Sequence, residues 1–180
     1  MKLIVCQDIE GNIGGNNSML WQNKEEMDIF KNLTVGNVVI MGYNTFISLK
    51  SKPLPNRVNI VLVGNRNNSL EYYNNTEKEF TNENTSLFFL EKDSELYNNI
   101  LSELSDKSIF VIGGGNTYKE FLDSEDISEI YISTILEDYS SSADVKFPDI
   151  DWEEWKLVYE ENHKNFIHQK WVNKVISTLI

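Results

Sequence analysis

Apolar residues occur along the chain in short runs separated by polar, turn-forming segments. Runs of this kind, bounded by Gly, Pro, Asn or Asp, are typical of strands that are buried on both faces. The pattern predicts strands over Lys2–Cys6, Val38–Met41, Val58–Val63, Leu87–Leu90, Ser108–Ile112 and Glu129–Ile135, and a closing antiparallel hairpin formed by Trp155–Glu160 and Phe166–Val175.

Apolar residues at helical spacing predict helices between these strands. Met27, Phe30 and Leu33 mark one face of a helix over Lys24–Leu33. Shorter helices are predicted over Thr45–Leu49, Ser94–Leu104 (with Asp93 as its cap) and Tyr118–Leu122.

Two polar segments have neither the apolar runs of strands nor apolar residues at helical spacing. We expect a mobile loop at Gly11–Asn17 and an irregular excursion at Asn65–Asn84 that contains one short strand near Leu70–Tyr73. Strand and helix alternate elsewhere through the first two thirds of the chain. The expected fold is therefore α/β: a central, mostly parallel β-sheet with an antiparallel C-terminal hairpin, flanked by helices, in a single domain over residues 1–180.

Composition narrows the possible partners and location. The chain has 28 acidic and 16 basic residues and a formal net charge of −12, which argues against nucleic-acid binding because phosphate contacts need a basic face. Its one cysteine, Cys6, lies in an apolar run and is interpreted as a small buried residue in a reducing compartment. There is no signal-peptide pattern and no run long enough to span a membrane, so we expect a cytoplasmic protein.

The run Gly113-Gly114-Gly115 lies where a predicted strand ends and a helix begins. Residues without Cβ atoms let a ligand approach the backbone, and the amides at the start of the next helix suit a phosphate. Close packing alone is the alternative explanation. Arg57 and Arg66 are the only arginines and thus candidates for gripping an anion, although a solvated surface charge is equally compatible with each.

Glu26 lies in the first turn of the helix that carries Met27 and Phe30. A carboxylate on that apolar side would have a raised pKa and could handle a proton near neutral pH. Asn23 stands three residues earlier, so a capping box that only ties the helix start is the alternative. His163 and His168 lack the neighbouring Cys or acidic spacing of a metal site or triad, and we expect no metal.

These pieces occur together in an order that resembles the dihydrofolate reductases. The likeness spans most of the chain and weakens over Asn65–Asn84. It rests on Ile13-Gly14, Met19 with Trp21, Glu26 with Phe30, Val39-Ile40-Met41-Gly42 with Thr45-Phe46, Pro53-Leu54-Pro55 with Arg57, Val111-Ile112-Gly113-Gly114-Gly115 with Tyr118 and Phe121-Leu122, and Phe147-Pro148.

The resemblance implies reduction of 7,8-dihydrofolate to tetrahydrofolate by hydride transfer from NADPH, in support of one-carbon metabolism and thymidylate synthesis. Glu26 would bind the 2-amino group and N3 of the pterin and favour protonation of N5. Ser133 stands where the family usually has a threonine that bonds this carboxylate, and Trp21 would hold an ordered water near it. The remaining substrate residues implied are Ile4, Val5, Met27, Phe30, Leu49, Leu54, Ile112 and Tyr118, with Arg57 on the glutamate α-carboxylate.

For the cofactor, the resemblance implies that backbone N–H groups hold the NADPH pyrophosphate and that the loop from Ile9 to Trp21 closes over the nicotinamide. The residues implied are Cys6, Ile13, Gly14, Met19, Gly42, Tyr43, Asn44, Thr45, Gly113, Gly114, Gly115, Asn116 and Thr117. The family's cis peptide would fall at Gly113-Gly114.

The chain departs from many bacterial relatives at Tyr43 and Asn116, where those relatives have arginines for the 2′-phosphate of NADPH. Arg66 is the expected substitute, with help from Lys50 or Lys52, and we expect reduced discrimination against NADH.

The resemblance also implies a monomer that binds dihydrofolate and antifolates such as methotrexate and trimethoprim. Two other functions stay open: a riboflavin-pathway pyrimidine reductase of the same fold, and an inactive structural or binding homologue. Glu26 with Trp21 and the Arg57 clamp favour the folate enzyme over both.

Overall fold

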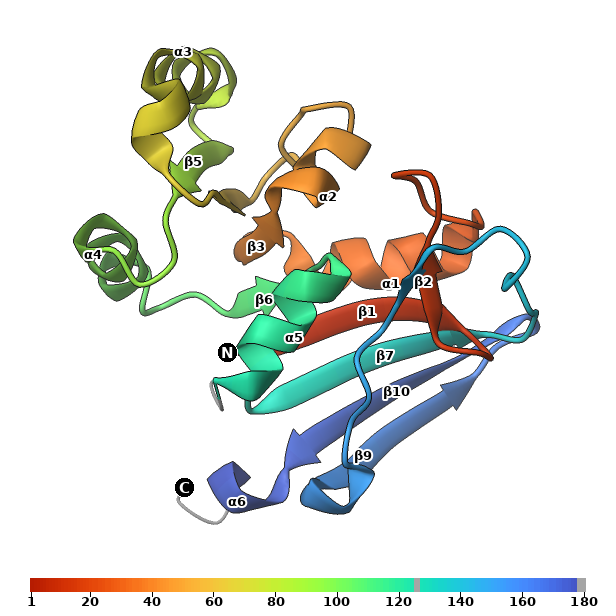
Figure 1. The fold of residues 1–180 in the computed structure, drawn as a ribbon. Helices are drawn as coiled ribbons and strands as arrows, with labels where there is room; N and C mark the ends of the chain where they lie inside the picture. Colours follow the sequence, from red (N-terminus) through yellow and green to blue (C-terminus); the bar gives the residue numbers. More distant parts are fainter. Residues whose placement is uncertain (125–126, 178–180) are drawn as a thin grey trace.

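The computed structural model describes residues 1–124 and 127–177, and its main sheet has eight strands in the order β5-β4-β3-β6-β1-β7-β10-β9 (Figure 1). Strands from β5 to β7 pair in parallel, whereas β7, β10 and β9 pair antiparallel. The predicted sheet is thus confirmed. Its strands are β1 (Lys2–Asp8), β3 (Val38–Gly42), β4 (Val58–Leu62), β5 (Ser86–Leu90), β6 (Ile109–Val111), β7 (Glu129–Ile135), β9 (Trp155–Asn162) and β10 (Phe166–Asn173).

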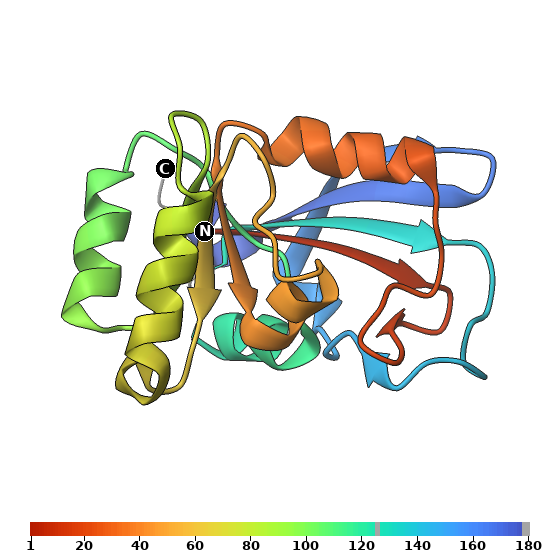
Figure 2. The same cartoon turned by 90° about the horizontal axis from the view of Figure 1, so that it is seen from above.

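Helices cover both faces of this sheet, and Figure 2 shows α1 and α5 on opposite sides of it. The longer helices are α1 (Lys24–Thr34), α3 (Leu70–Phe80), α4 (Glu95–Glu103) and α5 (Gly115–Asp123). The short α2 (Tyr43–Ser48) follows β3 directly, and α6 (Lys174–Ser177) follows β10. Single 3₁₀ turns lie at Arg66–Ser69 and Trp152–Glu154.

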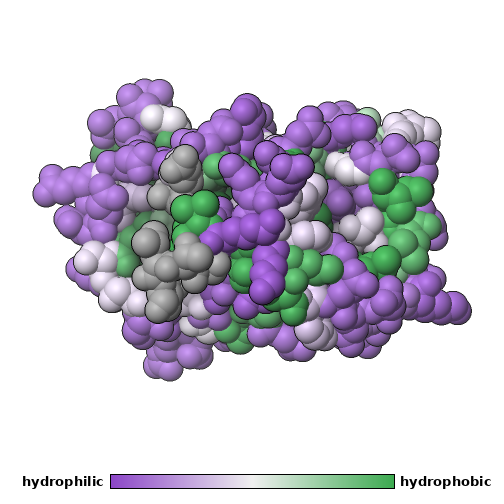
Figure 3. Space-filling view, turned by 90° about the horizontal axis from the view of Figure 1, so that it is seen from below, coloured by the Kyte–Doolittle hydropathy of each residue, from purple (hydrophilic) through white to green (hydrophobic). Residues whose placement is uncertain are grey.

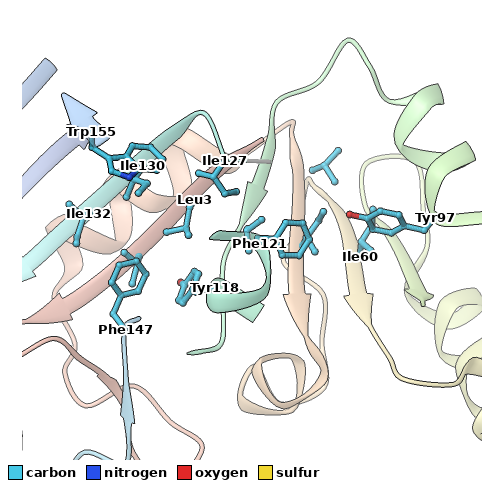
Figure 4. Close-up of a cluster of buried hydrophobic side chains, with 14 of the residues drawn as sticks. Leu3, Ile60, Tyr97, Tyr118, Phe121, Ile127, Ile130, Ile132, Phe147 and Trp155 are labelled. Atoms are coloured by element: carbon cyan, nitrogen blue, oxygen red, sulfur yellow. The ribbon is translucent and has the colours of Figure 1, made fainter. Parts of the chain in front are cut away.

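Successive residues of the central strands enter two different hydrophobic clusters, because strand side chains alternate between faces. Ile4, Val39 and Phe89 pack with Phe30 of α1 and Tyr73 of α3. The opposite cluster, drawn in Figure 4, includes Leu3, Ile60 and Ile130 with Tyr97 of α4 and Tyr118 and Phe121 of α5. Burial on both faces explains why these strands are almost continuously apolar in sequence.

The segment Asn65–Asn84 differs from the prediction of an irregular excursion with a short strand. The structure has a 3₁₀ turn followed by the helix α3, in which Tyr73 and Thr76 are buried. The ring of Tyr73 stacks on Phe89 of β5 with centroids 4.5 Å apart. Packing of one aromatic side on the sheet therefore stabilises a helix whose Asn-rich composition favours turns.

Several local boundaries also differ from those predicted. Ser94, not Asp93, caps α4, because its hydroxyl accepts a hydrogen bond from the Tyr97 backbone N–H at 3.2 Å. Helix α5 begins at Gly115, within the glycine run. Strand β10 ends at Asn173, whose side chain accepts from the Val175 N–H at 2.9 Å and starts the α6 turn.

The expected loop Gly11–Asn17 is also more regular than predicted. Its first part forms β2 (Asn12–Gly14), which pairs with β8 (Val145–Lys146) in a two-stranded sheet. The buried carboxylate of Asp8 orders this region, because it accepts hydrogen bonds from the Asn12 side chain at 2.8 Å and from the Tyr139 N–H at 2.7 Å. Two segments far apart in sequence are therefore joined through one side chain.

Among the described residues, no helix is long and apolar enough to cross a membrane. The face in Figure 3 is mostly hydrophilic, with apolar residues in separate groups.

Candidate active site

Glu26 is buried in the first turn of α1 with 5% of its surface exposed, whereas its neighbour Met27 is 53% exposed. The hydrophobic effect alone would bury the methionine and expose the glutamate, because glutamate is almost never fully buried and methionine usually is. Such an inversion is typical of a ligand site, where an apolar ligand covers the exposed methionine and meets the carboxylate.

The cap at the start of α1 forms through the backbone of Glu26, whereas a capping box would also use its side chain. The Asn23 side chain caps α1 by accepting from the backbone N–H of Glu26 at 3.1 Å. This bond uses only the main chain of Glu26, so its carboxylate is available for other contacts. Burial raises the pKa of that carboxyl, while hydrogen bonds from the Ser133 hydroxyl and the Cys6 thiol lower it in part. The net effect is a carboxyl that holds its proton to higher pH than an exposed glutamate.

Trp21 and Cys6 are paired by a hydrogen bond near the same site. The indole Nε1–H of Trp21 donates to Cys6 Sγ at 3.2 Å. Burial, and then the charge of Glu26, raise the pKa of the Cys6 thiol, which therefore remains protonated at neutral pH. The resemblance implied that Trp21 holds an ordered water near Glu26, and Cys6 was expected to be a small buried residue that also contacts the cofactor. In the structure the indole donates to the Cys6 thiol, and hydrogen bonding from this thiol lowers the pKa of the Glu26 carboxyl.

The apolar residues implied for the substrate fall into two groups. Ile4, Phe30, Leu49, Leu54 and Ile112 belong to one cluster, on the α1 side of the sheet. Val5 and Tyr118 pack in the opposite cluster, so the structure does not bring their side chains to the same surface. The Tyr118 hydroxyl donates to the Ile4 carbonyl at 2.8 Å, and burial raises the pKa of this phenol.

Arg57 is 6% exposed and is held by neutral partners. Its Nε donates to the Pro55 carbonyl at 2.9 Å and one terminal nitrogen donates to Thr34 Oγ1 at 3.0 Å. Burial lowers the pKa of the guanidinium, which stays charged at neutral pH. Within the described ranges no carboxylate forms an ion pair with Arg57, so its charge is available to an anionic ligand.

The turn before Arg57 is fixed by a buried side chain that sequence reasoning missed. Asn59 Oδ1 accepts from the Leu54 N–H at 2.8 Å, and its Nδ2 donates back to the Leu54 carbonyl at 3.0 Å. This pair of bonds sets Leu54 and Arg57 relative to β4. A polar residue within the apolar run Val58–Leu62 was the signal in the sequence.

The glycine run meets the end of β3, and both segments open a helix. Gly42 is the N-cap of α2 and Gly114 is the N-cap of α5, and neither helix start is capped by a side chain. The Gly42 N–H donates to the Gly113 carbonyl at 2.8 Å, and the Gly113-Gly114 peptide is cis, as the resemblance implied. A Cβ on Gly42 would lie 2.7 Å from Thr117 Oγ1, so the close approach requires glycine there.

These features fit the pyrophosphate of a dinucleotide. Two helix N-termini without side-chain caps present unpaired N–H groups and positive partial charge. Thr45 lies beside this junction, because a Cβ on Gly114 would be 3.3 Å from its Oγ1. Asn44 and Asn116 are exposed at the same helix starts. Nucleotide binding therefore has a structural basis besides the motif.

The loop that was expected to cover the nicotinamide lies against this junction. A Cβ on Gly115 would be 2.9 Å from Val145 Cγ1 and 4.0 Å from Ile13 Cδ1, so the β2-β8 sheet packs on the start of α5. Gly14 ends β2, its carbonyl accepting from the Asp144 N–H at 3.0 Å. Met19 is exposed and lies in the same loop.

Arg66 and Tyr43 are engaged within the protein. Arg66 pairs with Glu77 of α3 through bonds of 2.7 and 2.9 Å and also donates to Asn74 and to the Phe89 carbonyl. Hydrogen bonding to Glu77 raises the pKa of Arg66. The Tyr43 ring lies 6.4 Å from those of Phe46, Tyr73 and Phe89. The expected 2′-phosphate contact of Arg66 would compete with the Glu77 carboxylate.

His168 is the most consequential residue that sequence reasoning set aside. It is buried on β10 opposite Ser133, whose Oγ lies 2.9 Å from His168 Nδ1. The signal was its place two residues after Phe166, because side chains at this spacing share a face of a strand and Phe166 is strongly apolar.

Comparisons with known proteins agree with this geometry. A family model described as dihydrofolate reductase matches residues 1–175. The dihydrofolate reductase of Ureaplasma parvum serovar 3 is 33% identical over 174 residues, which cover 97% of each chain. The Haemophilus influenzae dihydrofolate reductase is 32% identical over 163 residues, or 90% of this chain and 87% of that one.

A solved structure shows the same fold. It is a dihydrofolate reductase from Enterococcus faecalis complexed with NADP(H) and RAB-propyl, and it matches with a TM-score of 0.69 and 25% identity over 96% of this chain and 95% of that one. Family model, relatives and fold coincide over nearly the whole sequence. The chain belongs to the dihydrofolate reductase family.

Proposed function

We propose that the chain reduces 7,8-dihydrofolate to 5,6,7,8-tetrahydrofolate with Glu26 as the ionisable group of the pterin site. The observation that carries this assignment is a buried carboxyl of raised pKa beside an exposed methionine, on the first turn of α1. A general acid or base is most effective when its pKa lies near the working pH.

NADPH, when bound, supplies the hydride that reduces the pterin, and the protein binds, orients and manages the proton. Glu26 accepts hydrogen bonds from the 2-amino group and N3 of the pterin and favours protonation at N5. Hydrogen bonding from Ser133 and Cys6 favours the ionised form of the Glu26 carboxyl. The loop that carries Met19 excludes water from the reacting carbon.

Arg57 binds the α-carboxylate of the substrate's glutamate. Its guanidinium is already oriented by Pro55 and Thr34, so little side-chain entropy is lost when the carboxylate arrives. This group also separates the folate enzyme from a riboflavin-pathway pyrimidine reductase, whose substrate has no pteroylglutamate carboxylate.

The cofactor preference follows from the cations near the 2′-phosphate. Tyr43 and Asn116 carry no charge, and Arg66 already bonds Glu77. NADH is therefore accepted more readily than in relatives with two arginines at those positions. Values of kcat/KM for NADPH and NADH test this. If Arg66→Ala leaves the NADPH preference unchanged, Arg66 does not bind the 2′-phosphate.

The assay for the function is the loss of NADPH absorbance when dihydrofolate is added, and its abolition by methotrexate. Glu26→Gln keeps the Asn23 cap on the backbone N–H and serves as a folded control with little turnover at neutral pH. Absence of turnover in folded wild-type protein would refute the enzymatic assignment and leave a binding or structural role. We further propose a single cytoplasmic domain that acts as a monomer, which sedimentation of the active protein would test.

A further inference from the structure

The buried imidazole of His168 lies in a polar row that leads to Glu26. Cys6, Ser133 and His168 are paired in register across β1, β7 and β10. Ile4 and Tyr131, two residues before the first two, pack in the cluster that includes Phe30 of α1. Because side chains two apart share a face of a strand, the row lies on the α1 side of the sheet, where Glu26 is.

Burial makes the contacts of this row obligatory. Ser133 is 2% exposed and His168 is 5% exposed, and their Oγ and Nδ1 atoms are 2.9 Å apart. Hydrogen bonding from the Ser133 side chain is also one of the effects that lower the pKa of the Glu26 carboxyl. The serine therefore interacts with a ring on β10 and with a carboxyl on α1.

The chemistry of the three groups fixes the direction of the bonds when Glu26 is ionised. A carboxylate can only accept, so Ser133 must give its single hydroxyl proton to Glu26. The serine oxygen can then only accept from His168, which requires the tautomer with the proton on Nδ1. Donation at one end of such a chain strengthens donation at the other.

Other titratable groups face the row. Glu161 of β9 pairs in register with His168, and the Tyr131 and Tyr159 rings lie 6.4 and 6.5 Å from the imidazole. His163 stacks on Phe166 and bonds Glu25 of α1 at 2.7 Å. Burial lowers the pKa of His168, with Glu161 opposing and His163 adding to that effect.

The surroundings of the carboxyl complete the set. The charge of Glu26 also acts on Cys6 and Tyr118. Burial raises the pKa of both, so each stays protonated. The imidazole is therefore a neutral donor at neutral pH.

We propose that His168 is a positioning residue: its Nδ1–H orients the Ser133 hydroxyl so that this hydroxyl donates to the Glu26 carboxylate. The inference rests on the proposed role of Glu26 for its effect on catalysis. Its effect on the carboxyl itself does not depend on turnover.

Asparagine and glutamine at position 168 form the matched test. The Asn amide nitrogen can occupy the place of Nδ1, whereas the Gln amide extends toward the place of Nε2. The carboxyl titration of Glu26 is followed by infrared spectroscopy of the ligand-free protein, with Glu26→Gln identifying its band. His168→Gln should raise the titration midpoint by roughly 0.5–1 pH unit, the value of one neutral hydrogen bond, and His168→Asn should leave it near wild type.

Kinetics provide the second readout. The pH profile of kcat/KM for dihydrofolate should move to higher pH by the same amount in His168→Gln and not in His168→Asn. In a Ser133→Ala background the glutamine substitution should have no further effect, because the bridge is gone.

Three results would overturn the proposal. An unchanged Glu26 midpoint in folded His168→Gln would show that His168 is not coupled to the carboxyl. A lowered midpoint would show that the hydrogen bonds run in the opposite direction. Equal shifts in His168→Gln and His168→Asn would show that only packing has changed. Full activity of Glu26→Gln at neutral pH would instead refute the proposed function, while the titration result would still stand.

Discussion

Replacing Gly42 with alanine tests the contact between β3 and α5 on which the nucleotide site depends. Gly42 has φ −72° and ψ 160°, a conformation open to any residue, so the substitution introduces no backbone strain. Its effect is steric: the new Cβ would lie 2.7 Å from Thr117 Oγ1, roughly 0.7 Å inside ordinary contact. Thr117 is buried in the first turn of α5, where a β-branched side chain has little freedom to rotate.

The size of the effect follows from that overlap. Overpacking of this kind costs typically about 1–3 kcal/mol, and the smaller entropy of the unfolded alanine chain returns about 0.4–1 kcal/mol. We expect a net loss of about 1–2 kcal/mol, or about 2–8 °C in Tm for a chain of this length. Urea denaturation and thermal melting measure it, and NADPH affinity should fall in parallel as α5 is displaced.

A second substitution identifies the cause. Thr117→Ala removes the oxygen that the new Cβ would strike, so Gly42→Ala should cost little in that background. Thr117→Val keeps an atom in the same place, and Gly42→Ala should remain as costly there as in wild type. A Gly42→Ala protein as stable as wild type, or equal losses in the alanine and valine backgrounds, would refute the steric explanation.

Three further predictions concern charge. The raised pKa of Glu26 means that its ionisation opposes folding. Glu26→Gln should therefore be more stable than wild type at neutral pH, and equally stable well below the ordinary glutamate pKa of 4.5. Melting curves measured against pH check this. Arg57→Leu should lower the affinity for methotrexate, which carries a glutamate, on the order of 10²-fold in titrations. The affinity for trimethoprim, which lacks a glutamate, should stay nearly unchanged, and the protein should lose no stability. Burial disfavours ionisation of Asp8, yet hydrogen bonds from Asn12, Tyr139 and Glu10 lower its pKa, so Asp8→Asn should lose about 2–4 kcal/mol at neutral pH in urea titrations. That difference should shrink as pH falls through the lowered pKa, because wild type then loses the ionised carboxylate too.

Much of the fold was predictable because its signals are local. The strands β1, β3, β4 and β7 are near-continuous apolar runs, and α1 combines an Asn23 cap with apolar positions at helical spacing. Capping and alternation depend on residues a few positions apart. Helix α3 was missed for the same reason: its Asn-rich sequence favours turns locally, and the stacking of Tyr73 on Phe89 that stabilises it comes from a different element.

The sequence by itself determined the eight strands of the main sheet, the helices α1, α2, α4 and α5, the Asn23 cap and the ordered motifs that resemble the family. Tertiary structure decided how the charged groups behave. Ser133 and His168 are 35 positions apart, yet strand register places them 2.9 Å from each other and next to Glu26 on another element. In the same way, Arg66 was expected to bind the 2′-phosphate of NADPH, but tertiary packing pairs it with Glu77 of α3. Burial and hydrogen-bond partners set a group's charge, and both are properties of the packed chain, so spacing along the sequence cannot supply them.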